Sequence, residues 1–181
     1  EFSSFPVTAV KNNAGGWYRN EGTAVVSLGS DSQASNYASF NGQGWYEWQE
    51  NIPFNPNATY KIDCRYRQVT DPSSGGKNFY CGWSGVASDG VTYVNRTGSN
   101  SYGSQHFHGA SAVSLTAGAG FSEKIGYTKG FGSPDGTSSS CNLATPCLIH
   151  SNVRYLRPMF LINYSAGNGT ADMDYIRITK Q

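Results

Sequence analysis

The sequence contains few charged residues. Lysine, arginine, aspartate and glutamate make up 14% of its 181 residues, against roughly 25% in an ordinary soluble domain, which excludes a coiled coil or a charged helical bundle. Long apolar runs are also missing, since no stretch approaches the roughly 18 residues of a membrane span. The formal net charge is +1, so no strong field attracts DNA, RNA or anionic lipid. We therefore expect neither nucleic-acid binding nor membrane insertion.

Helical periodicity is absent as well, because no segment of about 11 residues sustains a 3.6-residue repeat. Aromatic residues make up 14% of the chain and glycines number 22, and short strand-like segments alternate with turn clusters. About ten strands at this spacing predict an all-β fold, a β-sandwich or barrel. The expected strands are Thr23–Leu28, Trp45–Ile52, Ala58–Val69, Lys77–Val86, Val91–Val94, Ala112–Thr116, Glu123–Lys129, Cys147–His150, Arg154–Tyr164 and Ala171–Lys180.

The length suits a single domain. We assign residues 5–181 to one β-sandwich domain and residues 1–4 to a flexible start or cloning remnant, because Glu1-Phe2 resembles a cloning scar. With no signal peptide visible, we expect mature material or a cut fragment.

Alternation along the predicted strands indicates which faces are buried. In Ala58–Val69, apolar residues and polar residues take opposite faces, which is typical of a strand with one wet side. Ala171–Lys180 breaks the pattern, because Ile176 and Ile178 share a face with Asp172 and Asp174. In Arg154–Tyr164, Pro158 predicts a bulge or an unpaired backbone position.

The four cysteines form no C-x-x-C pair, so zinc and thioredoxin-like sites lack their spacing. Three disulfide pairings are possible. A hairpin of Lys61–Val69 with Lys77–Val86 around an Asp71-Pro72 turn would place Cys64 directly opposite Cys81. The remaining pair, Cys141 and Cys147, would close a small loop.

Two disulfides predict an oxidising location, so we expect a secreted or extracellular protein, on a cell or virion surface if attached. Free buried thiols in a cytosolic protein are the alternative. The N-glycosylation triplets are weak evidence of secretion, because they occur at about the frequency expected by chance. They begin at Asn57, Asn95, Asn163 and Asn168.

Two stretches resemble a known family. One is the loop and strand entry Ile52-Pro53-Phe54-Asn55-Pro56-Asn57-Ala58-Thr59-Tyr60-Lys61-Ile62; the other is Arg157–Tyr164 followed by a Gly-rich loop and Asp172-Met173-Asp174-Tyr175-Ile176-Arg177-Ile178. They resemble the galactose-binding-like jelly roll of carbohydrate-binding modules, and similar endings occur in terminal domains of phage tail fibres. The resemblance implies a two-sheet antiparallel β-sandwich that binds glycan.

The same resemblance implies further features of the site. Such modules often hold a structural Ca²⁺ through an acidic residue of the last strand, where Asp174 stands, and Glu21 or Asp31 are candidates for its partner. An asparagine in the loop before the last strand often contacts sugar, which is the place of Asn168.

Sugar binding needs flat apolar faces and planar polar groups. Gly44–Asn51 supplies both, and Trp17-Tyr18 suggests a loop-borne aromatic pair, whereas Trp83 shares the face of Cys81 and is expected in the core. Arg65 and Arg67 share a polar face, where they form a salt-bridge row with Asp63 or bind an acidic sugar. The candidate ligand-binding residues are Trp17, Tyr18, Trp45, Trp48, Arg65, Arg67, His106, His108 and Asn168.

Enzymatic alternatives rest on histidines and carboxylates. His106 and His108 would share a strand face, and with His150 they could hold a metal. A small jelly-roll polysaccharide lyase could use His106, His108, Arg65 and Gln105 as acid, base and uronate-neutralising groups. A hydrolase needs two paired carboxyls, which the sequence does not pair. No serine-hydrolase elbow or nucleotide fingerprint is present, so no nucleotide cofactor is expected.

The sequence as a whole predicts a non-catalytic module that binds an extracellular polysaccharide or surface glycan by aromatic stacking and hydrogen bonds. The alternatives are a small polysaccharide lyase or glycoside hydrolase, and a structural domain at a fibre tip or adhesin, for which an oligomer is possible.

Overall fold

The computed structural model describes most of the chain, and for residues 7–8 and 106–113 it describes the backbone alone. The described residues are 7–8, 16–71, 79–95, 97–98, 106–113, 116–132, 141–163 and 168–181. They form thirteen strands in two sheets. No helix of membrane-spanning length and hydropathy occurs among them.

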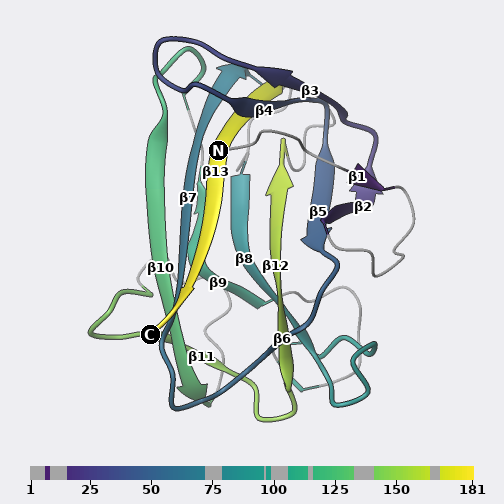
Figure 1. Cartoon of the computed structure of the whole chain (residues 1–181), viewed down its shortest axis with the longest axis vertical. Coiled ribbons are helices and arrows are strands. Elements are labelled where there is room, and N and C mark those ends of the chain that lie inside the picture. Colours follow the sequence, from purple (N-terminus) through teal and green to yellow (C-terminus); the bar gives the residue numbers. More distant parts are fainter. Residues whose placement is uncertain are drawn as a thin grey trace.

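The two sheets are built almost entirely from antiparallel neighbours, with parallel pairing only of β1 with β2 and of β10 with β11 in the described part. One sheet has the order β1 (Val7–Thr8), β2 (Trp17–Gly22), β5 (Gly44–Trp48), β12 (Tyr155–Ile162), β8 (Phe79–Val86) and β9 (His106–Val113), with β6 (Ile52–Pro53) also on β12. The other has the order β11 (Cys147–Ile149), β10 (Ser122–Phe131), β7 (Tyr60–Thr70), β13 (Thr170–Lys180), β4 (Tyr37–Asn41) and β3 (Val25–Gly29). In Figure 1, β10, β7 and β13 run side by side, as do β8, β12 and β5. The predicted all-β, two-sheet sandwich is therefore confirmed.

The core lies between the sheets and follows the alternation expected for β7. Tyr60, Ile62, Cys64 and Tyr66 point inward and are buried with rings from the other sheet. Tyr66 stacks on Phe79, with ring centroids 3.8 Å apart. Trp83 is fully buried in this core, as its sequence position predicts.

The disulfide partners are confirmed, but the hairpin that predicted them is wrong. Cys64 is bonded to Cys81 and Cys141 to Cys147. However, β7 pairs with β10 and β13, while β8 pairs with β12 and β9 in the opposite sheet. Alternation along the strands predicts that both cysteines face inward. That prediction is the same whether the two strands are neighbours in one sheet or lie opposite each other in two sheets. The Cys64–Cys81 bond therefore ties the two sheets together across the core.

A β-bulge explains the mixed face of the last strand. Met173 lies opposite Tyr66, and Tyr175 already lies opposite the next residue, Arg65, so Asp174 is an extra residue in β13. The bulge reverses the alternation. Asp172 before it points outward, whereas Ile176 and Ile178 after it pack against the core.

Pro158 occupies a position in β12 where one neighbour is missing. Towards β8 the register runs through without a shift. On the other side, β6 reaches Leu156 and β5 starts at Met159, so Pro158 faces the gap between them. Of the two predicted alternatives for Pro158, the unpaired backbone position is confirmed and the bulge is wrong.

Removing the inter-sheet disulfide should destabilise the chain more than removing the small-loop disulfide. The bonds close loops with sequence separations of 17 and 6 residues, for which chain entropy gives about 3 and about 2 kcal/mol. We expect Cys64→Ala/Cys81→Ala to lower the free energy of unfolding in urea by about 1 kcal/mol more than Cys141→Ala/Cys147→Ala. A larger loss from the second double variant would contradict this assignment.

Candidate functional site

A row of polar side chains crosses four strands on the outer face of the six-stranded sheet. The register places Ser27 of β3 opposite Ser39 of β4, Ser39 opposite Asp172 of β13, and Asp172 opposite Arg67 of β7. Their strand neighbours Phe40, Met173 and Tyr66 point the other way, into the core. Because side chains alternate along strands, the four polar residues share the outer face.

This row lines a groove of about 440 Å³, within the range of about 300–1,000 Å³ that small-molecule sites occupy. Further lining comes from the ring of Tyr37 at the start of β4, from the loop that enters β10, and from neighbours of the row on β3, β7 and β13. The lining residues beyond the row are Leu28, Gly29, Gln33, Tyr37, Gln68, Val69, Gly118, Ala119 and Thr170.

Tyr37 lies flat beside the row because the position opposite it is a glycine. A Cβ atom on Gly29 would stand 2.4 Å from the Tyr37 ring, so any larger residue there would displace the ring. The Tyr37 and Phe121 rings have centroids 5.9 Å apart. Tyr37 gives the groove a planar aromatic border, and Phe121, which does not line the groove, lies next to Tyr37.

The Arg67 guanidinium is held by rings and carboxylates together. Its central carbon lies 4.9 Å from the Tyr37 centroid and 4.3 Å from the Phe121 centroid. Its Nε donates to Asp172 Oδ2 at 2.8 Å, and its Nη2 lies 2.7 Å from Asp31 Oδ2. Burial lowers the pKa of Arg67, but the hydrogen bonds to Asp172 and Asp31 outweigh it, so the pKa is raised.

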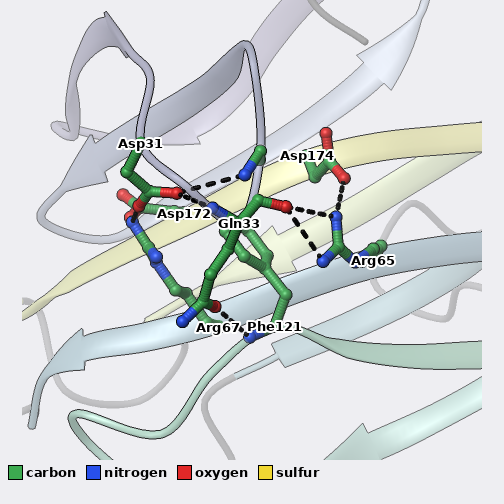
Figure 2. A network of polar contacts seen from close by, with 8 residues as sticks. Asp31, Gln33, Arg65, Arg67, Phe121, Asp172 and Asp174 are labelled. Carbon is green, nitrogen blue, oxygen red and sulfur yellow. Dashed lines mark hydrogen bonds and ion pairs between the residues drawn. The ribbon is translucent and has the colours of Figure 1, made fainter.

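Figure 2 shows that Arg65, two residues earlier on β7, secures the loop that carries Asp31. Its guanidinium donates to the Gln33 carbonyl and pairs with Asp174 at the bulge. The Gln33 side chain accepts a hydrogen bond from the Phe121 backbone N–H at 3.3 Å. Asp31 Oδ1 accepts from the backbone N–H groups of Gln33 and Ala34. The loop is thereby fixed over the sheet.

The charges of this cluster do not cancel. Three carboxylates, those of Asp31, Asp172 and Asp174, meet the two guanidiniums of Arg65 and Arg67. Asp172 is only 2% exposed, and its Oδ1 is buried without a hydrogen-bond partner. The excess of one carboxylate over the guanidiniums disfavours a further anion at this site.

Of the sequence-predicted ligand residues, Arg65 and Arg67 come together in this cluster, where they form ion pairs. The predicted partner Asp63 is wrong, because Asp63 pairs with Lys61 instead. The predicted aromatic residues lie elsewhere. Trp17 and Tyr18 lie in β2 rather than on a loop and are 5% and 7% exposed, and Trp45 is 4% exposed. Trp45 packs with Met159 and Leu161 on the outer face of the seven-stranded sheet.

Tyr18 belongs to a buried polar network on that same outer face. Its hydroxyl donates to Glu47 at 2.7 Å, and Tyr93 donates to the same carboxylate oxygen at 2.6 Å. Burial and the Glu47 carboxylate raise the pKa values of both phenols. Arg157, 1% exposed, bonds to Asn51 and to the Gly90 carbonyl. The network fixes the turn around Gly90 onto the sheet.

Trp48 is half-buried and borders a second, apolar crevice of about 220 Å³ between the sheets. It opens there because β4 pairs only with the first part of β13, from Thr170 to Met173. The other lining residues are Trp17, Ile52, Pro158, Ile176 and Ile178. No charged side chain lines this crevice, so it offers little to the hydroxyls of a sugar.

The remaining predicted site residues are placed as follows. Asn168 is exposed before β13, and Asp174 pairs with Arg65 rather than with Glu21 or Asp31. Within the described part of the chain, no group of three or more His, Cys, Asp or Glu could hold a metal ion. The side chains of His106 and His108 and all of Gln105 lie outside the described residues, as do residues 1–4.

The glycosylation triplets differ in accessibility. Asn57 and Asn168 are exposed, whereas Asn95 and Asn163 are buried. The Asn163 side-chain amide donates to the carbonyls of Gly42 and Gly169. A glycan on Asn163 is therefore incompatible with this fold.

Tyr37, Phe121 and the two serines were not identified from the sequence. They come from three separated segments with no motif, and only the strand register brings them together. For the pairing of Asp172 with Arg67 the sequence held half of the signal, because Arg67 stands on a predicted polar strand face whereas the face of Asp172 is mixed.

Comparisons with known proteins concern the fold. The sequence matches no protein-family model, and no curated protein matches it significantly. The enzymatically active domain of tailspike protein 4 from bacteriophage CBA120 superposes with a TM-score of 0.53 at 10% identity, covering 94% of this chain and 20% of the tailspike chain. The CBM22-1 xylan-binding domain of Paenibacillus barcinonensis Xyn10C superposes with a TM-score of 0.50 at 12% identity, covering 91% and 85%.

This chain thus corresponds to about a fifth of the tailspike chain and to most of the xylan-binding domain. It has the jelly-roll fold found in carbohydrate-binding modules, as the sequence resemblance predicts.

The Asp31–Arg67 ion pair should persist into mild acid. Hydrogen bonds from the Gln33 backbone, from Arg67 and from Ala34 lower the pKa of Asp31 below its ordinary value of 3.8. The contribution of this carboxylate is therefore complete above pH 3.8 and is lost as the pH falls through the lowered pKa. A carbon-detected NMR titration of the Asp31 carboxyl should give a midpoint below 3.8, and a midpoint at or above 3.8 would contradict the described contacts.

Proposed function

We propose that this protein is a non-catalytic, extracellular module that binds a polysaccharide or surface glycan in the groove over Ser27, Ser39, Asp172 and Arg67. The observation that carries the proposal is the combination of a planar aromatic border with a polar floor in one groove. Tyr37 offers a ring beside the floor, and Ser27, Ser39 and Thr170 offer hydroxyls. A sugar presents the matching pair of surfaces, an apolar C–H face and a rim of hydroxyls.

Two other places in the described part of the chain suit a sugar less well. The crevice at Trp48 has an almost wholly apolar lining, so each buried sugar hydroxyl would lose a hydrogen bond to water without replacement, at a cost of about 1–3 kcal/mol. The polar groups around Glu47 are buried and already bonded to one another. The groove alone among these combines open volume, a ring and polar groups.

Glycoside hydrolysis is less well supported at this groove. A general acid in such enzymes needs a raised pKa, whereas the pKa of Asp31 is lowered. The Oδ2 atom of Asp172 is bound to Arg67, and its Oδ1 atom is buried, so neither oxygen faces a ligand as a free acid. The lyase alternative depends on His106, His108 and Gln105, whose side chains the structure does not describe, so it stays a prediction. The same applies to a role at a fibre tip or adhesin.

Filling the groove should abolish glycan binding. Ser27 is exposed in the edge strand β3, so Ser27→Trp adds a large side chain on the groove floor without changing the core. We expect at least a tenfold loss of affinity, about 1.4 kcal/mol, in affinity electrophoresis against a polysaccharide panel. Thr179→Trp is the matched control, because Thr179 is exposed on β13 and does not line the groove.

Retardation of the wild type by at least one polysaccharide, kept in Thr179→Trp and lost in Ser27→Trp, would support the proposal. Equal retardation of all three proteins would place the site elsewhere. Release of new reducing ends or of ultraviolet-absorbing unsaturated uronates from the same panel would contradict the non-catalytic assignment.

A further inference from the structure

We propose that the groove accepts uncharged saccharides and rejects uronates, and that Asp31 sets this selectivity by occupying Arg67. This inference rests on the proposed function, because it names the class of saccharide that the groove takes. It reverses the ordinary expectation for two arginines on the polar face of one strand, which is that they recognise carboxylates.

The first step is the charge of the groove. Among the lining residues, Arg67 and Asp172 are charged, and Asp31 adds a second carboxylate at the same guanidinium nitrogen that Asp172 contacts. Arg67 Nη2 lies 2.7 Å from Asp31 Oδ2 and 2.8 Å from Asp172 Oδ2. A uronate approaching Arg67 would therefore become a third carboxylate around one cation, repelled by the two already present.

The second step is that the two carboxylates differ in how easily they can be displaced. The Asp172 side chain is 3% exposed and lies inside the sheet row, so moving it would leave a buried charge unpaired. The Asp31 side chain is 31% exposed and stands in a loop. A substitution of Asp31 can therefore remove one negative charge from Arg67 and leave the buried Asp172–Arg67 pair in place.

The third step concerns what a ligand gains. Asp172 lies opposite Ser39 in the strand register, and Ser27, Ser39 and Thr170 line the groove with hydroxyls. A serine or threonine hydroxyl both donates and accepts, so it can pair with a sugar hydroxyl or with a carboxylate, directly or through a bridging water. A uronate therefore gains no hydrogen bond there that an uncharged sugar lacks, whereas the uronate alone is repelled by the Asp31 and Asp172 carboxylates.

Asp31→Asn is a clean test because the turn needs only one of the two carboxylate oxygens. Oδ1 accepts from the Gln33 and Ala34 N–H groups, and an asparagine carbonyl can do the same. Oδ2 is the atom that contacts Arg67, and the substitution replaces it with an uncharged amide. The loop is kept, and Arg67 loses one of its two anions.

Asp89→Asn is the matched control. Asp89 is also exposed, and its Oδ1 also caps a turn by accepting from the Val91 and Thr92 N–H groups. It follows β8 of the seven-stranded sheet and lines neither the groove nor the Arg67 cluster. The two variants carry the same change in net charge, so a difference between them reports on the site.

The experiment is affinity electrophoresis at low and high salt on three polymer pairs that differ mainly in carboxylates. The pairs are methyl-esterified and de-esterified homogalacturonan, carboxyl-reduced and native glucuronoxylan, and hydroxyethyl- and carboxymethyl-cellulose. For the wild type we expect binding to at least one uncharged polymer, with at least tenfold weaker binding to its acidic partner. Asp31→Asn should bind the acidic partner at least threefold more tightly than Asp89→Asn does, with the gain shrinking at high salt.

The outcomes separate this inference from the proposed function. Wild-type binding of both members of a pair with equal affinity, or of acidic members alone, would overturn the selectivity and leave glycan binding standing. Equal behaviour of Asp31→Asn and Asp89→Asn, with unchanged melting temperatures, would overturn the role of Asp31. Retardation by no polymer at all, in any variant, would contradict glycan binding itself and the inference with it.

Discussion

The contact between Asp172 and Arg67 lies at the centre of this structure. It joins β13 to β7 in the middle of the six-stranded sheet, and the residues flanking each partner point into the core. A buried carboxylate requires such a partner, since an unpaired one would cost several kcal/mol. The bulge at Asp174 then returns Ile176 and Ile178 to the interior. The Asp172–Arg67 pair and the bulge after it together allow β13 to place a carboxylate on its outer face and apolar side chains on its inner face.

Much of the fold was predictable because it depends on local alternation. The burial of one face of residues 58–69, the core position of Trp83 and the inward direction of Cys64 and Cys81 follow from a period of two. Alternation does not report which sheet a strand joins, so the predicted hairpin was wrong although its disulfide was right. In the sequence, the bulge at Asp174 showed only as a break in the alternation of residues 171–180, because a single inserted residue leaves no motif.

The site was less predictable, because aromatic composition does not reveal which rings the fold leaves open. The indoles of Trp17 and Trp45 and the ring of Tyr18 are buried, and the open ring of the groove belongs to Tyr37, across from Gly29. Arg65 and Arg67 were identified because they share a strand face. Their partners Asp31 and Asp174 reach them through a loop and a bulge, which only the tertiary structure places.

The central claim is that a saccharide lies on the row that crosses β3, β4, β13 and β7. Backbone amide NMR shifts, recorded while xylo- and cello-oligosaccharides are added, test it most directly. The account predicts perturbations confined to Ser27, Ser39, Gly118, Thr170 and their neighbours. Perturbations centred on Trp48 and Ile178, or around Tyr18 and Gly90, with the groove amides unmoved, would contradict it.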